Sequence, residues 1–340
     1  MKAAVFHGPD RPLSVEEVPT PTAGGGQVLI RVAGCGVCHT DLHYTDHGTP
    51  TFKRPPMILG HEISGIVEGA GEGVGGRKPG DRVLVAAVTS CGACDACREG
   101  RENICAHGEM LGNHIDGGFA EYVVAPAKDT FLLPDGVPLV EGSIIADAVT
   151  TPYHAVVNRG RVRPGDAVVV FGCGGVGLNV VQMAAAQGAR VVAVDLSDDK
   201  LAWARKLGAA ATVNPGGVER LDKELRKVTG GGADVAFEVV GRPVTQEQTL
   251  ACLKTGGRAV FVGYSPDTMT LNSGRVMFRE LEVVGSLGCR PVDYPRVVEM
   301  VRQKRIQLEP LVTHRFPLDR IAEAFDTLRS GSAIRVVVTP

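Results

Sequence analysis

Hydrophobic and polar positions divide the chain into two parts near residue 149. Before this point, short apolar stretches alternate with polar residues and are interrupted by glycine and proline, as in QVLIRVAG and DRVLVAAV. This pattern is typical of a β-rich domain. After it, apolar runs of strand length alternate with segments of helix length. Such an order predicts an α/β domain built on a doubly wound parallel sheet.

Six strands are predicted in the second part, and several of them are almost entirely apolar. They cover residues 168–172, 191–195, 211–213, 235–239, 259–263 and 282–286. The helices expected between them cover residues 176–187, 198–207, 218–228 and 245–254. Because these strands are apolar on both faces, we expect helices to cover the sheet on both sides.

From about residue 290 the pattern changes to two helical segments and a last strand at residues 335–339. We expect this strand to rejoin the first part of the chain. The predicted organisation is a β-rich domain, a doubly wound domain and a returning segment, at residues 1–148, 149–287 and 288–340.

Composition and charge exclude several classes of protein. A chain of 340 residues is long enough for two domains with substantial cores. Its 36 Lys and Arg residues nearly balance its 38 Asp and Glu residues, so the charge does not favour binding to nucleic acid or anionic lipid. The N-terminus has no apolar signal segment, and the longest apolar run, residues 167–178, is too short to span a membrane. We therefore expect a cytoplasmic protein.

Four of the nine cysteines lie within fifteen residues, at Cys91, Cys94, Cys97 and Cys105. Four thiolates complete a tetrahedral zinc shell, whereas the alternatives are disulfides or unrelated buried thiols. The surrounding glycines and polar residues indicate an exposed loop, where free thiols would be reactive. An odd number of cysteines without an export signal also favours reduced metal ligands. The spacing predicts a structural zinc site, with no open position for chemistry.

The turn after the first strand of the second part reads FGCGGVG. Gly172, Gly174 and Gly177 have the spacing that allows a tight turn, close approach of a pyrophosphate and close helix packing. The next strand ends at Asp195, an acid suited to bond a ribose 2′-hydroxyl and to repel a 2′-phosphate. These residues predict NAD rather than NADP. Alternatively, the glycines form a turn without a nucleotide. Lys200 either reaches the same ribose or is a solvated helix residue.

A second set of metal-binding residue types lies outside the cysteine loop. The segment GVCHTDLH contains Cys38, His39, Thr40, Asp41 and His43, and the segment GHE contains His61 and Glu62. Each residue alone is equally well explained as part of the core or as a solvated loop residue. From these residues alone, a catalytic metal site is one interpretation among others.

The motifs GVCHTDLH, GHE, CGACDAC, DGGFAEYV and FGCGGVG occur in an order that resembles the zinc-dependent medium-chain alcohol dehydrogenases. The resemblance covers essentially all 340 residues. It implies an α/β protein in which a GroES-like catalytic domain accompanies a Rossmann domain that binds NAD. It also implies two zinc ions per chain, one structural and one catalytic.

The resemblance assigns ligands to the catalytic zinc. By position, Cys38 and His61 look like zinc ligands, and Glu62 resembles an exchangeable ligand behind the metal. Many family members have a cysteine at the third ligand position, but this chain has Asp147, as some bacterial members do. An aspartate in place of a thiolate should strengthen the Lewis acidity of the zinc and weaken its retention. Alternatively, Asp147 is only an acid in the cleft.

The resemblance also implies a proton path. Thr40 resembles the hydroxyl that takes the alcohol proton, which then passes through the cofactor ribose to His43. Asp41 resembles the carboxylate that orients His61.

Further cofactor contacts follow from position. His39 and Arg335 resemble basic residues at the pyrophosphate, and Thr151 resembles the threonine at the nicotinamide. The remaining implied contacts are Gly175, Val176, Val239, Val262, Gly263, Tyr264 and Leu287. Alternatively, those of them at strand ends are ordinary core residues without a cofactor contact.

The expected activity is hydride transfer between an alcohol and NAD, giving a ketone or aldehyde (EC 1.1.1.-). Thr49, Ala86 and Ala87 are small where ethanol-active relatives have aromatic residues, which favours secondary, cyclic or aryl alcohols. His114 either lines the pocket entrance or lies in an exposed turn. The runner-up is a polyol or hydroxyacyl-CoA dehydrogenase of the same family.

Two other classes fit less well. A zinc-free quinone or enoyl reductase would lack the metal-binding residues, and a non-catalytic protein on this scaffold would be expected to lose Thr40 and His43. We expect a small-molecule substrate, no nucleic-acid or membrane partner, and a homo-oligomer, with a tetramer favoured by the resemblance.

Overall fold

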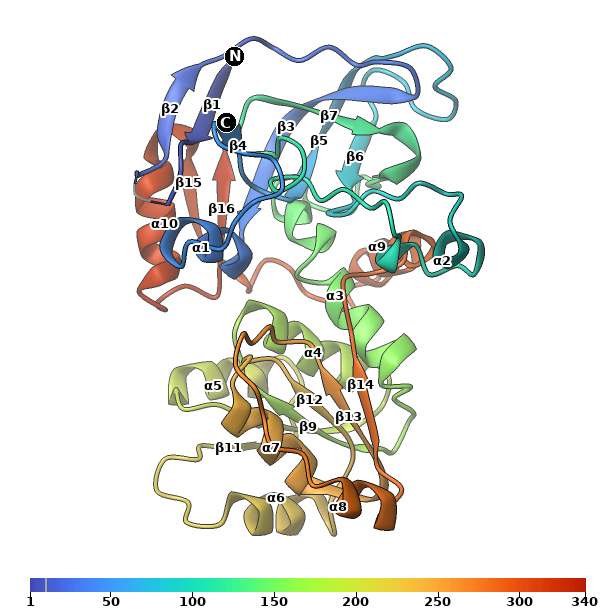
Figure 1. Ribbon diagram of the computed structural model, residues 1–340, viewed down its shortest axis with the longest axis vertical. Helices are drawn as coiled ribbons and strands as arrows, with labels where there is room; N and C mark the ends of the chain where they lie inside the picture. The colour runs from blue at the N-terminus through green and yellow to red at the C-terminus, as the bar shows by residue number, and fades with distance from the viewer. Residues whose placement is uncertain (10) are drawn as a thin grey trace. The chain divides into compact units, whose positions relative to one another are not determined.

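The computed structural model describes residues 1–9 and 11–340. These residues form two compact units (Figure 1). The first unit contains Met1–Thr150 and Gly288–Pro340, and the second contains Thr151–Leu287. Both ends of the described chain therefore belong to the first unit.

The second unit is a six-stranded parallel sheet. Its strands lie in the order β11-β10-β9-β12-β13-β14, so the chain winds outward from β9 in both directions. This confirms the predicted doubly wound sheet, whose ligand crevice is expected at the carboxyl ends of the central strands. The strands are β9 (Ala167–Phe171), β10 (Arg190–Val194), β11 (Ala211–Val213), β12 (Ala233–Glu238), β13 (Leu253–Phe261) and β14 (Glu282–Gly285).

Helices connect these strands. They are α4 (Gly175–Ala186), α5 (Asp198–Lys206), α6 (Leu221–Thr229), α7 (Pro243–Cys252) and α8 (Ser273–Phe278). The helix predicted to reach residue 254 ends at Cys252 instead, because Leu253 already pairs with β12. Arg226 and Arg279 also donate to the Leu253 carbonyl and satisfy the end of the helix. The short helix α8 was not predicted from the sequence.

The first unit is built from two sheets. The smaller has the order β2-β1-β4, with β1 (Lys2–Phe6), β2 (Ser14–Glu17) and β4 (Met57–Ile58). The larger has the order β15-β16-β3-β5-β6-β8, with β7 also paired to β3. Its strands are β3 (Gln27–Val37), β5 (Glu62–Ala70), β6 (Arg82–Val85), β7 (Tyr122–Pro126), β8 (Thr130–Leu132), β15 (Val312–Pro317) and β16 (Arg335–Thr339). Since β16 pairs antiparallel with β3, the last strand of the chain lies beside a strand near its beginning.

Helices α1 (His39–Asp46), α2 (Asp95–Arg98), α9 (Tyr294–Arg302) and α10 (Ile321–Arg329) complete the first unit, and α3 (Thr150–Tyr153) begins at the boundary. In the core of the first unit, the rings of Phe119 and Phe325 pack edge to face, with their centres 5.7 Å apart. Arg329 of α10 binds both carboxylate oxygens of Asp46 at 2.8 and 2.9 Å and ties α10 to α1. Among the described residues, no helix has the length and apolar character needed to cross a membrane.

Candidate functional site

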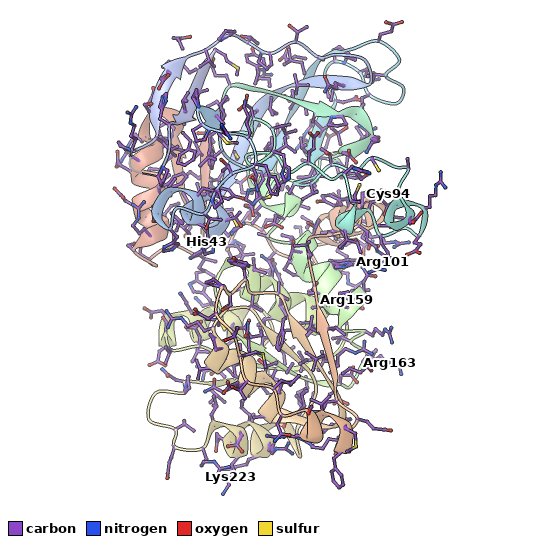
Figure 2. The ribbon with its side chains drawn as sticks, viewed as in Figure 1. His43, Cys94, Arg101, Arg159, Arg163 and Lys223 are labelled. Carbon is purple, nitrogen blue, oxygen red and sulfur yellow. The ribbon has the colours of Figure 1, made fainter. Side chains whose placement is uncertain are left out.

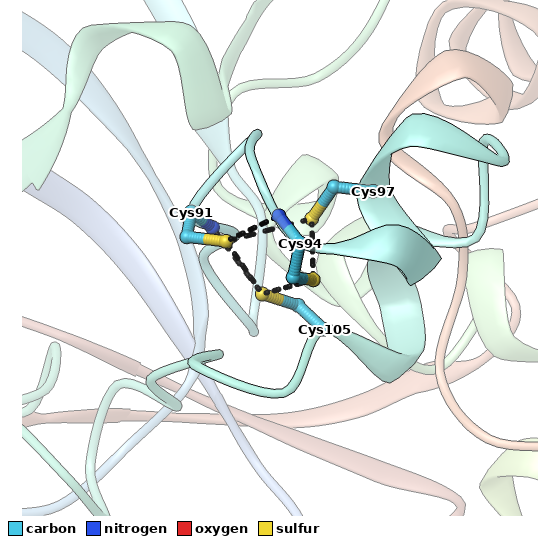
Figure 3. A group of neighbouring side chains, drawn as sticks. All are labelled: Cys91, Cys94, Cys97 and Cys105. Carbon is cyan, nitrogen blue, oxygen red and sulfur yellow. Dashed lines mark hydrogen bonds between the residues drawn. The ribbon is translucent and has the colours of Figure 1, made fainter.

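The four clustered cysteines bring their sulfur atoms together in one loop of the first unit (Figure 3). The Sγ–Sγ distances are 3.4 Å for Cys91–Cys105, 3.5 Å for Cys94–Cys97, 3.7 Å for Cys94–Cys105 and 3.9 Å for Cys91–Cys97. A disulfide requires about 2.05 Å, so none of these pairs is bridged. Zinc–sulfur bonds of about 2.3 Å place tetrahedral sulfurs about 3.8 Å apart. The arrangement therefore fits a Cys₄ zinc site and not a disulfide framework.

Backbone N–H groups support the same interpretation. Ala93 and Cys94 each donate to the sulfur of Cys91 at 3.4 Å, and His107 donates to that of Cys105 at 3.4 Å. The two donors to Cys91 lower its pKa to about 6. Such hydrogen bonds stabilise the thiolate, which is the form that binds a metal.

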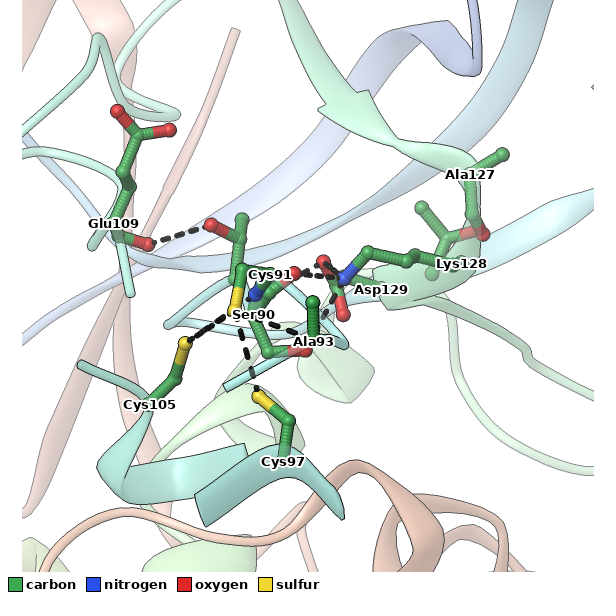
Figure 4. Close-up of polar contacts among 11 residues, drawn as sticks. Ser90, Cys91, Ala93, Cys97, Cys105, Glu109, Ala127, Lys128 and Asp129 are labelled. Atoms are coloured by element: carbon green, nitrogen blue, oxygen red, sulfur yellow. Dashed lines mark hydrogen bonds and ion pairs between the residues drawn. The ribbon is translucent and has the colours of Figure 1, made fainter. Parts of the chain in front are cut away.

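The cysteine loop is anchored at its first residues (Figure 4). Lys128 donates to the carbonyl and hydroxyl oxygens of Ser90 and binds Asp129 at 2.7 Å. The buried Asp129 carboxylate also accepts from the Ser90 N–H at 3.4 Å. Thr89 pairs with the Glu109 carbonyl through its N–H and its hydroxyl, at 2.8 and 3.1 Å. These contacts fix the base of the loop.

A second cluster gathers Cys38, His61, Glu62 and Asp147, whose candidate ligand atoms all lie within 4.8 Å of one another. Cys38 follows β3 at the start of α1, and His61 immediately precedes β5. Asp147 follows a 3₁₀ segment, Glu141–Ala146. The pairing of β3 with β5 therefore brings together residues that are far apart in the sequence.

The atoms of this cluster fit a metal ion. The Asp147 Oδ2 atom lies 3.8 Å from His61 Nε2 and 4.0 Å from Cys38 Sγ, within about 0.5 Å of the ligand separations around a tetrahedral zinc. His61 is 1% exposed, yet neither ring nitrogen has a hydrogen-bond partner. Among the described residues, buried atoms without a partner also occur on Asp41, Glu62 and Arg335 in this region, and elsewhere on Arg82, Glu102, Ser143 and Ser286. A buried imidazole without a partner is costly, and a bound cation would satisfy it.

Charged neighbours surround the cluster. Arg335 is buried and donates to the Oε1 atom of Glu62, whose other oxygen has no partner. Burial alone would raise the pKa of Cys38, but the neighbouring His61 and Arg335 lower it overall. One carboxylate oxygen of Asp41 accepts a hydrogen bond from the Cys38 N–H at 2.9 Å, and the other lies 3.8 Å from His61 Nδ1. That separation is longer than a hydrogen bond, so orientation of His61 by Asp41 stays a prediction.

The predicted proton path starts beside the cluster. The Thr40 hydroxyl lies 3.6 Å from the sulfur of Cys38. His43, one turn further along α1, is half-buried and lies on the first unit (Figure 2). Its ring centre is 5.3 Å from that of His47. Burial, followed by the charge of His47, lowers the pKa of His43 below its ordinary value of 6.5.

The glycine-rich turn in the second unit lies between β9 and α4. Gly172 has a φ of +94°, and a side chain on Gly177 would place its Cβ 1.9 Å from the Gly172 carbonyl oxygen. Both glycines are therefore required by the turn. The Asp195 carboxylate accepts from the N–H groups of Cys173 at 2.7 Å and Ser197 at 2.9 Å. The acid at the end of β10 is thus tied to the turn itself.

Other predicted cofactor residues are distributed over both units. Gly174, Gly175 and Val176 belong to the glycine-rich turn and the start of α4, and Lys200 lies in the first turn of α5. Val239, Val262, Gly263 and Tyr264 follow the carboxyl ends of β12 and β13. Thr151 is buried, whereas His39, Tyr264 and Leu287 are exposed. Their cofactor contacts, and that of Arg335 with a pyrophosphate, stay predictions.

Sequence reasoning missed two features of these sites. One is the pairing of Arg335 with Glu62, which joins residues 273 positions apart. The other is Glu238, a fully buried acid at the end of β12. The available signal was its place in the apolar run DVAFEVV, where an unpaired charge would be unfavourable.

Comparison with known proteins identifies the family. A model described as "Alcohol dehydrogenase GroES-like domain" matches residues 24–135, and one described as "Zinc-binding dehydrogenase" matches residues 175–303. An alcohol dehydrogenase from Moraxella sp. (strain TAE123) is 37% identical over 97% of this chain and 96% of its own length.

Two solved structures extend this likeness to the fold. An NAD-dependent alcohol dehydrogenase covers 100% of both chains at 33% identity, with a TM-score of 0.92. A protein from Sinorhizobium meliloti 1021 bound to NADP covers 100% of this chain and 99% of its own, at 32% identity and a TM-score of 0.91. The chain therefore belongs to the zinc-dependent medium-chain alcohol dehydrogenases, with the GroES-like and Rossmann-type domains of that family.

Proposed function

We propose that the protein is an NAD-dependent zinc alcohol dehydrogenase that acts on secondary, cyclic or aryl alcohols and the matching carbonyl compounds. The observation that carries this proposal is the cluster of Cys38, His61 and Asp147, in which a buried imidazole has no hydrogen-bond partner. Three protein ligands leave one position of a tetrahedral zinc open for substrate.

The residues of the cluster have distinct roles in this proposal. When bound, zinc supplies the Lewis acidity that favours the deprotonated alcohol, and a nicotinamide accepts the hydride. Cys38, His61 and Asp147 hold the metal. Glu62, kept behind them by Arg335, is the exchangeable ligand. Burial of His61 and Glu62 keeps water from these groups.

Thr40 and His43 remove the alcohol proton. The position of the Thr40 hydroxyl beside Cys38 supports its role as the first acceptor. His43 passes the proton to solvent, and its lowered pKa keeps the ring neutral, and therefore able to accept a proton, at neutral pH.

The preference for NAD over NADP is assigned to Asp195. Its carboxylate is held in place by two backbone N–H groups, from Cys173 and Ser197. A carboxylate fixed at the end of β10 favours a ribose hydroxyl and repels a phosphate.

The substrate class rests on small residues. Ala86 and Ala87 are buried immediately after β6, and Thr49 follows α1. Their size supports a pocket that accepts a ring or a branched chain. The ring of His114 stacks on that of Phe52, with the ring centres 4.1 Å apart. If His114 lines the pocket entrance, Phe52 lies there with it.

We also propose that the chain forms a homo-oligomer. Met277 and Phe278 are 72% and 83% exposed, and they lie shortly before β14, the edge strand of the parallel sheet. Exposed apolar side chains next to a strand edge support an association surface. Light scattering after gel filtration tests for a tetramer.

A substrate panel tests the proposed function. The purified, zinc-loaded protein is assayed with primary, secondary, cyclic and aryl alcohols, polyols and hydroxyacyl-CoA esters, each with NAD and with NADP. The proposal predicts the highest kcat/KM for a secondary, cyclic or aryl alcohol with NAD. A preference for polyols or hydroxyacyl-CoA esters would replace the substrate class, and absence of any dehydrogenase activity would contradict the function.

A further inference from the structure

Glu238 is the last residue of β12 and has no exposed surface. Its Oε1 atom accepts hydrogen bonds from the N–H groups of Val240 and Gly241, both at 2.9 Å, and from the Thr245 hydroxyl at 2.6 Å. Its Oε2 atom accepts from Gly241 at 3.2 Å. The carboxyl group therefore folds the chain back after β12 and joins this turn to the first turn of α7.

The backbone of Glu238 holds a second loop. Its carbonyl oxygen accepts from the N–H groups of Val262 at 2.9 Å and Gly263 at 3.0 Å, directly after β13. A Cβ on Gly263 would lie 2.4 Å from the Gly241 nitrogen and 2.9 Å from Glu238 Oε2. The two loops are thus in direct contact, with the carboxyl group of Glu238 at the contact.

The same loops touch the glycine-rich turn. A Cβ on Gly172 would lie 2.8 Å from a methyl group of Val240. The turns that follow β9, β12 and β13 therefore pack against one another at the carboxyl ends of adjacent strands. In an open parallel sheet, this edge is where a dinucleotide binds.

A buried acid at this place is unfavourable unless its acceptors are satisfied, and an apolar residue would avoid that cost. The four accepted hydrogen bonds of Glu238 satisfy the carboxyl group, and they tie the turn after β12 to the first turn of α7 rather than to the sheet itself. The carboxyl group therefore fixes the geometry of this turn, against which the loop after β13 packs, and such fixing is useful where the two loops must present a defined surface.

We propose that Glu238 is a positioning residue that shapes the Val239–Gly241 and Val262–Tyr264 loops to receive the nicotinamide half of the dinucleotide. The inference rests on the proposed function, because it requires a nicotinamide cofactor. Glu238 acts through these loops and touches no reacting atom. The adenosine half is assigned to other residues, the glycine-rich turn and Asp195, whose carboxylate accepts from Cys173 and Ser197 and not from the turn that Glu238 holds.

Glu238→Gln is the sharpest variant because it preserves the shape of the side chain. The amide oxygen replaces one acceptor, but the amide nitrogen then faces a backbone N–H, so two donors oppose each other. Thr245→Val removes one of the four hydrogen bonds and is the milder variant. Glu219→Gln, an exposed acid in the same unit, is the matched control.

The test compares two ligands by calorimetry on the full-length, zinc-loaded protein. NADH contains the nicotinamide, whereas ADP-ribose lacks it. Glu238→Gln is expected to weaken NADH binding roughly tenfold or more, the effect of losing hydrogen bonds to a charged group, and to leave ADP-ribose binding within about twofold. Thr245→Val should show the same selectivity with a smaller loss, and Glu219→Gln should bind both ligands as the wild type does.

The other possible outcomes would contradict either the positioning role of Glu238 or the proposed function. Equal weakening of both ligands, or no weakening of either, would overturn the positioning role of Glu238. If Glu238→Gln does not fold, the selectivity of Thr245→Val decides, and a loss that is equal for both ligands overturns the inference. Failure of the wild type to bind NADH contradicts the proposed function instead, and is seen before any variant is measured.

Discussion

Arg335 and Glu62 form a buried ion pair between the first residue of β16 and the first residue of β5. Their side chains are 2% and 0% exposed. Arg335 donates to one oxygen of Glu62, and the Glu62 carboxylate also belongs to the cluster that contains Cys38, His61 and Asp147. The guanidinium therefore restricts where the Glu62 carboxylate can lie.

Arg335→Met should be strongly destabilising, because it leaves the buried Glu62 carboxylate without its partner. Removing one member of such a pair costs about 3 to 5 kcal/mol. Urea unfolding of the zinc-loaded protein measures the loss. Arg320→Met, which removes an exposed pair with Glu323, is the control and should change the free energy of unfolding little, because solvent screens an exposed ion pair. Similar losses for the two variants would mean that the buried pair has no special role.

Cys94→Ser should lose one zinc per chain and aggregate, because three thiolates do not complete the Cys₄ shell. The matched control is Cys252→Ala, which removes a buried thiol far from either cluster in the sequence. Zinc content and light scattering of the two purified variants provide the comparison. Retention of full zinc content and solubility by Cys94→Ser would show that the loop does not depend on a metal.

Asp195→Gly should shift the cofactor preference toward NADP. The substitution removes the carboxylate that repels a 2′-phosphate, and it also frees the N–H groups of Cys173 and Ser197. The ratio of kcat/KM for NAD to that for NADP measures the shift, which we expect to be on the order of tenfold or more. An unchanged ratio, or a wild type that already prefers NADP, would refute the assignment of Asp195 to the ribose.

His43 should control the acidic limb of the pH profile of alcohol oxidation. Because burial and His47 lower its pKa, the neutral, proton-accepting form persists below pH 6.5, and the rate should rise with pH through an inflection below that value. His47→Gln should move the inflection upward, since it removes the repelling charge. His43→Gln should flatten the limb, and imidazole buffer should partly restore the rate. A limb unchanged in both variants would mean that protons leave by another path.

The doubly wound sheet was predictable because its strands are apolar on both faces, so the strand signal is local. The end of α7 was not, because it depends on the pairing of Leu253 with β12 and on Arg226 and Arg279, which donate to the Leu253 carbonyl from elsewhere in the chain. Local preference continues a helix, whereas a distant hydrogen-bond donor ends it.

In the candidate site, too, local sequence signals were predictable, whereas contacts between residues distant in the sequence were not. The cysteine spacing is itself a local signal for a metal site. The cluster of Cys38, His61 and Asp147 was proposed from resemblance, since β3 and β5 bring Cys38 and His61 together only in the folded sheet, and Asp147 joins them from after the segment Glu141–Ala146. Glu238 and Arg335 were not recognised as buried structural residues, because charged residues are normally expected at the surface.

Zinc stoichiometry of wild type and Asp147→Ala, measured together with alcohol oxidation, tests the central claim most directly. We expect about two zinc ions per chain in the wild type and about one in Asp147→Ala, with the Cys₄ zinc retained and turnover abolished at every pH. A wild type that is active without zinc, or an Asp147→Ala variant that retains both zinc ions and its activity, would contradict the assignment of Cys38, His61 and Asp147 as the catalytic zinc site.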